Sequence, residues 1–524
     1  MAVVQTKKVQ RTVGEPNAEY ESVRRQWQIN RAICTGETLT KELDLILDLG
    51  EYTNLLLPFS NSMSQLQYNF YRSEAELPGV VSQYTKMLVG ALLRKQPRLE
   101  LPADVPEDAE EWLLDAFGQD STPLAAFLEK ALIEELQTSR AWVFVTYPHV
   151  EKPEEMTQED FDRLKPYPVL WRGDQVINWR LAKDEVTGDN TLLSVIVKGY
   201  TDDFSESEFH PEKLETVWVH DVLEGYYRVR TYQLKTPADG VVASGKPQPP
   251  NTATAARYEL VSTETDIIVN GERLRQIPAW PLNGSVELTD PILTPLVDKE
   301  ISLYNKLSRR NHLLYGAATY TPVIASDMSD EDFEDIVGAG LGSWVKLRQG
   351  DEAFVLDTPT SALSDMDRAI SAGYEEMAKL GIRMLSPEVS QSGVALELRN
   401  ASQTALLGTL NLKVSNQLAD IMAFMLSWRY RRDYTSKDVK VTLSSDFSAT
   451  PIGEGWARLA TDWYQSGLIP RSIWLNILKE NDLVEADYDD ESGQQEIAED
   501  ELIPNAQDLS LDGASSDLSS DVNK

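Results

Sequence analysis

The sequence predicts an α+β fold in which helices come first, antiparallel strands follow and helices return. Apolar residues recur every three or four positions through residues 17–100 and 106–139, which is typical of helices packed against a core. Between 141 and 282, short β-branched and aromatic runs alternate with turn residues. Helical spacing resumes at 291. This order predicts a helical region joined to a largely antiparallel β region and followed by a second set of helices.

The first region is predicted to contain helices over Tyr20–Cys34, Leu39–Glu51 and Pro78–Arg94, with two more between 106 and 139. The acids that crowd the start of the fourth helix suit the positive end of a helix dipole. Pro123 stands where the fifth would begin.

The β region starts with a strand over 141–147, whose residues are aromatic or β-branched. Further strands are predicted at Val176–Trp179, Leu192–Val197, Thr216–Val222, Tyr226–Leu234, Tyr258–Val261 and Asp266–Val269. A Pro-, Gly- and Ala-rich stretch between Pro237 and Ala256 is predicted to be an exposed loop.

After the β region, a helix over 291–315 leads into a small insert over 317–360, and a helix over Ser364–Ile382 returns. The insert is predicted to hold strands at Thr321–Ile324, Trp344–Leu347 and Ala353–Leu356 and a short acidic helix at Ser329–Val337. A loop marked by Pro387 follows the returning helix.

A very long helix is predicted from about Val394 to Tyr430, with its apolar residues in one stripe. At 1.5 Å per residue it would span roughly 50 Å. A strand at Val439–Leu443 and two short helices, around Trp456–Ser466 and Arg471–Glu480, come next. The last 40 residues hold 13 acids and one base, and this composition predicts a disordered tail.

The composition excludes several classes of protein. The chain has 524 residues and a net charge of −35, so it lacks the basic footprint with which a protein grips nucleic acid. One cysteine rules out a disulfide framework, and four scattered histidines argue against a metal site. Neither a secretory signal nor a membrane-spanning run is expected.

No catalytic constellation stands out, so we expect no enzymatic activity, no catalytic or metal residues and no cofactor. The sequence has no GxxxxGK[ST] phosphate loop and no HExxH motif. Gly338-x-Gly340-x-Gly342 opens no helix and is better explained as a tight turn.

Three short motifs, taken in order, resemble the portal protein of tailed bacteriophages (the head-to-tail connector). Pro295-Leu296-Val297-Asp298 followed by Tyr304-Asn305-Lys306-Leu307-Ser308 is similar to the first stem helix of that family. Ser392-Gly393-Val394-Ala395-Leu396, at the start of the long helix, resembles the segment after its tunnel loop. Gly467-Leu468-Ile469-Pro470-Arg471-Ser472-Ile473-Trp474 resembles a C-terminal piece of many portals. The resemblance covers roughly residues 20–485.

The resemblance implies a portal fold with a wing of helices and antiparallel strands, a helical stem, a small α/β clip, a long wing helix and a short helical crown. In this sequence the parts would be 1–290 for the N-terminal region and wing, 291–316 for the first stem helix, 317–360 for the clip, 361–383 for the second stem helix, 384–394 for the tunnel loop, 395–445 for the long wing helix and return strand, 446–484 for the crown and 485–524 for the tail.

The resemblance also assigns roles to residues. The tunnel loop near DNA would contain Ser386, Pro387, Glu388, Val389, Ser390, Gln391, Ser392 and Gly393. Transient phosphate contacts, or salt bridges between subunits, would come from Lys306, Arg309, Arg310, Lys346 and Arg348, although compensation of helix dipoles and ordinary surface charge explain these residues better. Subunit packing in the stem would use Leu293, Val297, Ile301, Tyr304, Leu307, Ile370, Tyr374 and Met377.

Portals form homo-oligomeric rings, usually of twelve subunits, at one capsid vertex. Double-stranded viral DNA is packaged and ejected through the ring. The implied partners are the large subunit of the terminase, a head-tail adaptor at the clip, and the major capsid and scaffolding proteins, with no membrane involved. The implied location is the virion, with the host cytoplasm during assembly. The long helices and the insert between 291 and 382 argue against the alternative of another virion structural protein, such as a capsid or tail subunit. The absence of a dense polar constellation argues against a cytosolic multidomain enzyme.

Overall fold

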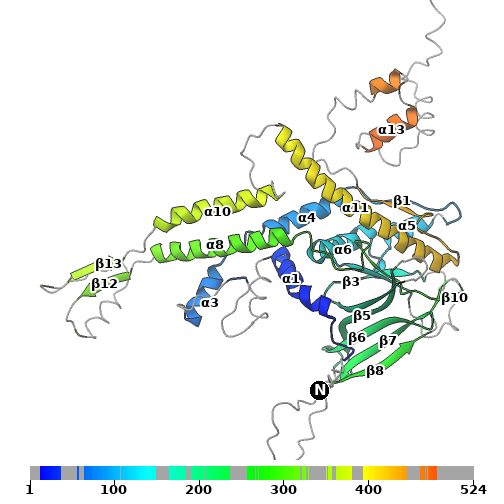
Figure 1. Ribbon diagram of the computed structural model, residues 1–524, viewed down its shortest axis with the longest axis horizontal. Coiled ribbons are helices and arrows are strands. Elements are labelled where there is room, and N and C mark those ends of the chain that lie inside the picture. Colours follow the sequence, from blue (N-terminus) through cyan, green and yellow to red (C-terminus); the bar gives the residue numbers. More distant parts are fainter. Residues whose placement is uncertain are drawn as a thin grey trace, which may run out of the picture. The chain divides into compact units, whose positions relative to one another are not determined.

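The computed structural model is a mixed fold of helices and antiparallel sheets (Figure 1). It describes residues 12–36, 56–57, 64–106, 108–148, 164–183, 190–205, 207–235, 257–265, 267–269, 271–318, 321–325, 329, 350, 352–356, 361–380, 393–444, 461–466, 468 and 470–480. The chain divides into two compact units, Met1–Ser445 and Asp446–Lys524. The break falls where the sequence separates the return strand from the predicted crown.

Helices form over most of the first region, as its apolar spacing predicts, although no separate helix was predicted over 65–74. They are α1 (Ala18–Thr35), α3 (Gln65–Glu74), α4 (Val80–Leu92), α5 (Asp108–Asp115) and α6 (Leu124–Thr138). The side chain of Asn17 caps α1 by accepting a hydrogen bond from the Tyr20 N–H at 2.7 Å. α6 ends at Ser139, whose left-handed conformation stops the helix. The predicted helix over Leu39–Glu51 lies outside the described residues.

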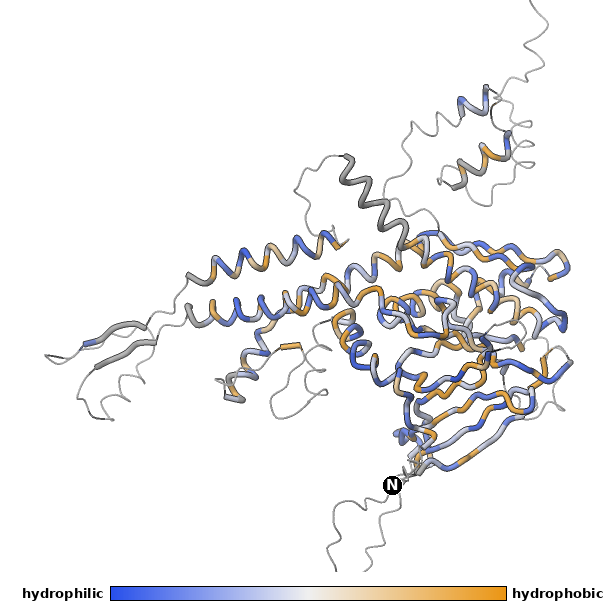
Figure 2. The backbone as a smooth tube through the Cα atoms, in the orientation of Figure 1, coloured by the Kyte–Doolittle hydropathy of each residue, from blue (hydrophilic) through white to orange (hydrophobic). Residues whose placement is uncertain are grey.

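Strands β2 to β11 form two larger antiparallel sheets. The three-stranded sheet has the order β11 (Ala279–Pro281), β2 (Trp142–Thr146), β3 (Tyr167–Trp171). The five-stranded sheet is a meander of β4 (Val176–Lys183), β5 (Asn190–Asp203), β6 (Glu212–Leu223), β7 (Tyr226–Lys235) and β8 (Arg257–Glu264). A separate hairpin pairs β9 (Ile268–Val269) with β10 (Glu272–Arg273). Strands of the meander alternate between hydrophilic and hydrophobic residues, as a sheet with one buried face requires (Figure 2).

Four strands were not predicted. β10 belongs to the short hairpin with β9, and the other three pair with segments that are more distant in sequence. β1 (Arg98–Glu100) pairs with β14 (Lys440–Thr442), so the expectation of helix throughout 17–100 was wrong at its end. β3 and β11 border β2 on its two sides. β1 and β11 span three residues each, which is too short for a pattern of period two to be recognised.

The last part of the first unit follows the predicted order. It contains α8 (Thr294–Ala318), β12 (Thr321–Ala325), β13 (Glu352–Leu356), α10 (Ser361–Lys379), α11 (Gly393–Tyr430) and β14. β12 and β13 pair antiparallel. The predicted helix at Ser329–Val337 and strand at Trp344–Leu347 lie outside the described residues. In the second unit, residues 461–465 are helical and α13 spans Arg471–Glu480.

The core gathers around the second half of α11, which is buried on several sides rather than along the one predicted stripe. Ile421, Met422, Met425 and Leu426 are all fully buried, and α11 contacts α4, β2, β11 and β14. Trp280 of β11 packs on Phe424, with their rings 5.1 Å apart. A helix enclosed in this way loses its polar face, since each side meets another element.

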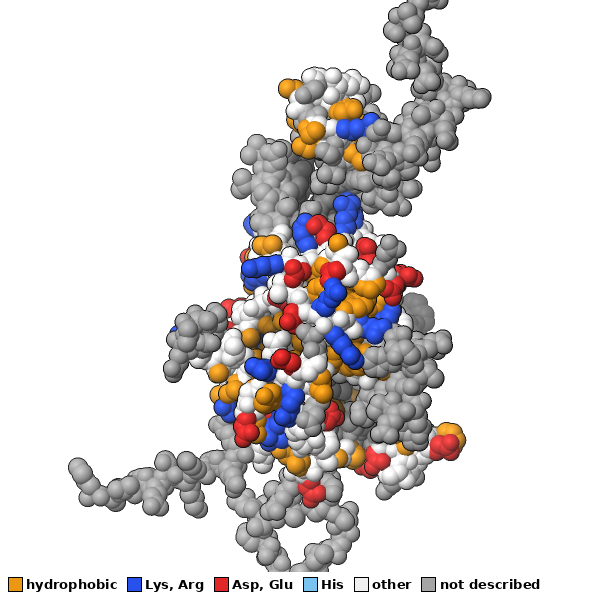
Figure 3. All heavy atoms as spheres, turned by 90° about the vertical axis from the view of Figure 1, so that its right-hand side faces the viewer, with side chains coloured by type: hydrophobic (Ala, Val, Ile, Leu, Met, Phe, Trp, Pro, Cys, Tyr) orange, Lys and Arg blue, Asp and Glu red, His pale blue; other side chains and the backbone are white. Residues whose placement is uncertain are grey.

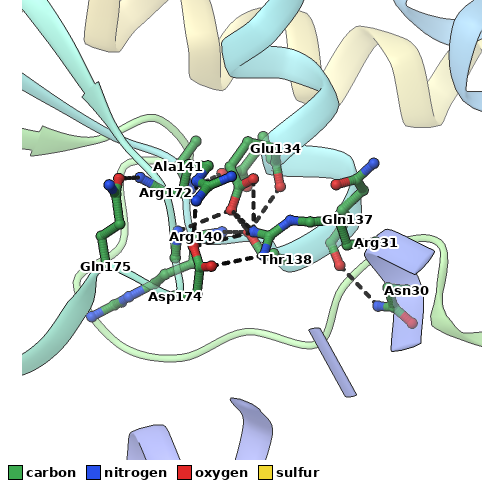
Figure 4. A network of polar contacts seen from close by, with 12 residues as sticks. Asn30, Arg31, Glu134, Gln137, Thr138, Arg140, Ala141, Arg172, Asp174 and Gln175 are labelled. Carbon is green, nitrogen blue, oxygen red and sulfur yellow. Dashed lines mark hydrogen bonds and ion pairs between the residues drawn. The ribbon is translucent and has the colours of Figure 1, made fainter. Parts of the chain in front are cut away.

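A buried polar network joins α1, α6 and the turn between β3 and β4 (Figure 4). Arg31 of α1 lies between two carboxylates, 2.8 Å from Glu134 and 2.9 Å from Asp174. Glu134 also accepts the Gly173 N–H at 2.9 Å. Because Glu134 is almost fully buried, its charge depends on Arg31 for compensation.

We expect Arg31→Ala to lower the free energy of unfolding by about 3 kcal/mol, because Glu134 would remain as an uncompensated buried charge. Arg24→Ala on the same helix removes an exposed pair with Glu21 and should cost less than about 1 kcal/mol. Urea unfolding of both variants measures the difference. Equal losses would show that the network contributes no more than a surface pair.

Candidate functional site

The most distinctive arrangement in the first unit is the antiparallel pair of α8 and α10, joined by β12 and β13 (Figure 1). Ion pairs fix its register. Lys299 Nζ lies 2.6 Å from a Glu376 carboxylate oxygen, and Arg310 Nε lies 2.5 Å from an Asp367 carboxylate oxygen. The later residue of α8, Arg310, pairs with the earlier residue of α10, Asp367, which is the order that antiparallel helices require.

Between these ion pairs, the helices meet through a small residue. A Cβ atom at Gly373 would lie 2.6 Å from Leu303 Cδ2, so the lack of a side chain at Gly373 makes room for the Leu303 side chain between the helices. Leu303, Ile370 and Met377 are buried at this seam. Charged residues lie at the edges of the seam between α8 and α10, and apolar residues lie in its middle. Hydropathy therefore alternates along both helices, as Figure 2 shows.

The base of α8 is held by buried polar side chains. Glu300 is fully buried, and its two carboxylate oxygens accept the Val80 and Val81 N–H groups at 3.0 and 2.6 Å. Val80 and Val81 are the first residues of α4. The N-cap residue of this helix is Gly79, which has no side chain that could accept hydrogen bonds from their N–H groups. Asn30 of α1 donates to Thr294, the first residue of α8, at 3.0 Å. Two helices of the first region therefore fix the direction of α8.

Burial governs the electrostatics of this joint. Burial raises the pKa of Glu300, and the N–H groups of Val81 and Val80 oppose the shift because they stabilise the carboxylate. The exposed Glu376 behaves in the opposite way. Its hydrogen bond from Lys299 holds its pKa below the usual value.

The predicted stem-packing residues prove to be buried largely inside one chain. Leu293, Val297, Tyr304, Ile370 and Met377 are buried, whereas Ile301, Leu307 and Tyr374 are half-buried. α10, α1, α3 and α4 all contact α8 within the same chain, which accounts for the apolar stripe. Contact between subunits through these residues stays a prediction.

Two of the predicted phosphate-contacting cations face α10. Arg310 pairs with Asp367, and Lys306 Nζ donates to the Ala369 carbonyl at 3.4 Å. Arg309 is exposed and lies close enough to Tyr71 to hydrogen-bond it. Lys346 and Arg348 lie outside the described residues. A role in contacting phosphate stays a prediction for all five.

The predicted tunnel loop also falls largely outside the described part of the chain. Gly393 is the first residue of α11, and Ser386–Ser392 are not described. Among the described residues, no group of His, Cys, Asp or Glu side chains is placed to hold a metal ion. None of the described helices is long and apolar enough to cross a membrane.

Sequence reasoning missed the residues that position the pair. Glu300 occupies the apolar side of its helix, and only the position of α4 explains a carboxylate there. Gly373 was not singled out, because it is one glycine within a helical stretch. A glycine inside a helix lowers stability, however, and that cost could have indicated a close approach of another element.

Comparison with known proteins adds the following. Residues 292–429 match a family model described as a domain of unknown function, DUF4055. The matched segment begins two residues before α8 and ends one residue before the end of α11. No curated protein matches the chain.

Two solved structures are similar to this chain at low identity. One comes from the "Virion of native gene transfer agent (GTA) particle", with 11% identity, a TM-score of 0.37 and coverage of 84% of this chain and 98% of that one. The other comes from the "Neck of empty GTA particle computed with C6 symmetry", with 12% identity, a TM-score of 0.38 and the same coverage.

The close seam predicts a strong effect of adding bulk at Gly373. We expect Gly373→Val to cost about 2–3 kcal/mol in unfolding free energy, because its side chain would overlap Leu303. Ala372→Val is the matched control, since Ala372 is the exposed neighbour and the change should cost under about 1 kcal/mol. Denaturant unfolding compares them, and equal costs would mean that the helices are not in tight contact.

The raised pKa of Glu300 predicts a dependence of stability on pH. The folded state holds the Glu300 proton more tightly than the unfolded chain does. Its contribution is therefore complete below the usual pKa of 4.5 and is lost as pH rises through the folded pKa. As pH rises above the usual pKa of 4.5, wild type should lose stability relative to Glu300→Gln.

Glu376→Gln provides a control of opposite sign. The pKa of Glu376 is lowered, so its contribution is present above the usual value and is lost on acidification. As pH rises, wild type should become more stable relative to the Glu376→Gln variant. The difference in unfolding free energy between wild type and each variant should change with pH in opposite directions. If both differences change in the same direction, the burial of Glu300 does not control its ionisation.

Proposed function

We propose that this chain is a virion structural protein, and specifically the subunit of a portal ring through which double-stranded DNA enters and leaves a capsid. The observation that carries the proposal is the helix–hairpin–helix of α8, β12, β13 and α10, followed directly by the 38-residue α11. This is the order in which the resembling family places stem, clip, stem and long wing helix.

The internal construction of the pair supports a rigid stem. Its register is set by ion pairs at both ends of a close apolar seam, and its base is fixed to α1 and α4 through Asn30 and Glu300. A stem must transmit load between a clip and a wing without bending. A helix pair with a buried polar joint at one end suits that task.

The charge of the chain supports passage of DNA rather than a grip on it. A protein that neutralises many phosphates binds tightly and releases many counterions, which would oppose sliding. A net charge of −35 per subunit instead repels phosphate. Since Lys306 and Arg310 face α10, Arg309 is the exposed one of these three cations and the one proposed to make brief phosphate contacts.

The remaining roles follow from the same proposal. The ring would occupy one capsid vertex, would receive DNA from a terminase, and would then bind a head-tail adaptor through the segment between α8 and α10. The chain itself would have no enzymatic activity in this account. Its motor would be the separate terminase.

The test is electron microscopy and sedimentation of the purified full chain. We expect closed rings of about twelve subunits with a central hole wide enough for duplex DNA. Ala372→Val should form the same rings, whereas Gly373→Val should form fewer because it disturbs the stem. A wild-type protein that stays monomeric over a wide concentration range, or that forms shells or tubes, would contradict the proposal.

A further inference from the structure

One buried carboxyl group lies where three segments of the first unit meet. Glu135 belongs to the last turn of α6 and is 2% exposed. In Figure 3, charged side chains of both signs lie on the surface of the molecule, where water hydrates them. Glu135 has no such access to water, so the stability of its charged form depends on the groups around it.

Hydrogen bonds reach Glu135 from two other segments. Its Oε2 accepts the N–H of Ala141, the residue before β2, at 3.0 Å. The Asn283 side chain, from the segment between β11 and α8, donates a second hydrogen bond to the carboxylate. Both donors are neutral, so they stabilise the carboxylate without supplying a compensating charge.

The turn after α6 is also joined directly to the segment that leads into α8. The Leu282 N–H donates to the Ala141 carbonyl at 2.8 Å. Asn283 Nδ2 donates to the Ser139 carbonyl at 2.9 Å. Ser139 Oγ in turn donates to the Asp290 carbonyl at 3.3 Å, four residues before α8 begins.

We call Glu135 together with residues 139–141 and 282–290 the α6–α8 joint. The carboxyl group of Glu135 is bonded to both of the other segments, through Ala141 and Asn283. Its ionisation therefore affects how firmly the chain is held just before α8.

The charges that act on Glu135 come from α6, from the turn after it and from α11. Glu134, its neighbour on α6, opposes ionisation, whereas Lys413 of α11 favours it. Arg140 of the turn is the third charged group, and burial lowers its own pKa to about 10. Burial has the largest effect on Glu135 as well, and it raises the pKa of this carboxyl group to about 7.

We propose that the α6–α8 joint is a pH-sensitive latch, which stays closed while Glu135 is protonated and opens more often once Glu135 is ionised. In its neutral form, the carboxyl group keeps an oxygen for the Ala141 N–H and costs little to bury. In the open state, residues 282–290 separate from the turn and water hydrates the carboxylate. Local opening of this kind removes the cost of a buried charge without unfolding the chain.

Opening depends on pH because the two states bind the proton of Glu135 with different strengths. The pKa is raised to about 7 in the closed state and returns toward 4.5 once water reaches the group. Between these values, each rise of one pH unit should increase the open population up to about tenfold. At higher pH both states are ionised, so the increase levels off at about 300-fold overall.

Hydrogen exchange in the full chain tests the latch. The Leu282 N–H is bonded across the joint, so its exchange reports on opening. Its rate, divided by that of an unprotected amide at the same pH, gives the open population. This ratio should rise about a hundredfold between pH 4.5 and 7.5 in wild type. It should stay flat in Glu135→Gln, whose side chain has nearly the same size and no charge.

The five-stranded sheet gives an internal reference, and Glu300 gives a matched variant. Val217 is fully buried in β6, the middle strand of that sheet, so its amide reports on unfolding of the whole unit. If Leu282 and Val217 show the same increase, the joint opens only with the whole protein, and the latch is overturned. Glu300→Gln should keep the Leu282 dependence, because it removes a different buried carboxyl group.

Lys413 gives a second variant, and its exposed position on α11 makes the substitution compatible with the fold. Since Lys413 favours ionised Glu135, Lys413→Gln should move the pH at which the Leu282 ratio levels off to a higher value. Lys437→Gln, at another exposed lysine, is the control and should leave that pH unchanged. A wild-type ratio that does not change with pH, or that changes equally in Glu135→Gln, would overturn the proposal.

Discussion

The pair of helices α8 and α10 depends on one buried carboxyl group. Glu300 projects from α8 into the first turn of α4 and accepts two N–H groups that the helix cannot satisfy itself. A charge this deeply buried is stable only if its hydrogen bonds are complete, so the angle between the two helices is tightly constrained. Through α8, that constraint extends to the seam with α10. The direction of the helix pair is thus set at its base, inside the helical region, rather than along its length.

The acidic composition shapes the interior and the surface differently. Inside, each buried acid has a specific partner, as Glu134 has Arg31 and Glu135 has the Ala141 N–H. Burial nevertheless raises the pKa of Glu135 to about 7. Over the whole chain, acids outnumber bases and give a net charge of −35. The fold is therefore held by paired charges, while the net charge of the chain repels other anions.

Local patterns predicted the long elements well, because each carries its own evidence of periodicity. α1, α4, α6, α8, α10, α11 and β7 formed close to the predicted bounds, whereas the other meander strands formed at the predicted places but are longer than predicted. The short strands β1 and β11 were missed, since three residues show no period and their pairing partners lie far away in sequence. For the candidate site, the helix–hairpin–helix order was predictable, but its key residues were not. The roles of Gly373 and Glu300 exist only where a second helix lies against them.

By itself, the sequence determined the order and type of the elements, the lack of a basic footprint and the acidity of the C-terminal residues, because these follow from composition and from periodicity within short windows. Only the tertiary structure decided which sides of those elements are used. It buried α11 on several sides and turned Lys306 and Arg310 toward α10. The reason is physical. The identity of a side chain fixes what it can bind, but its partner is chosen by elements that come together from distant parts of the chain.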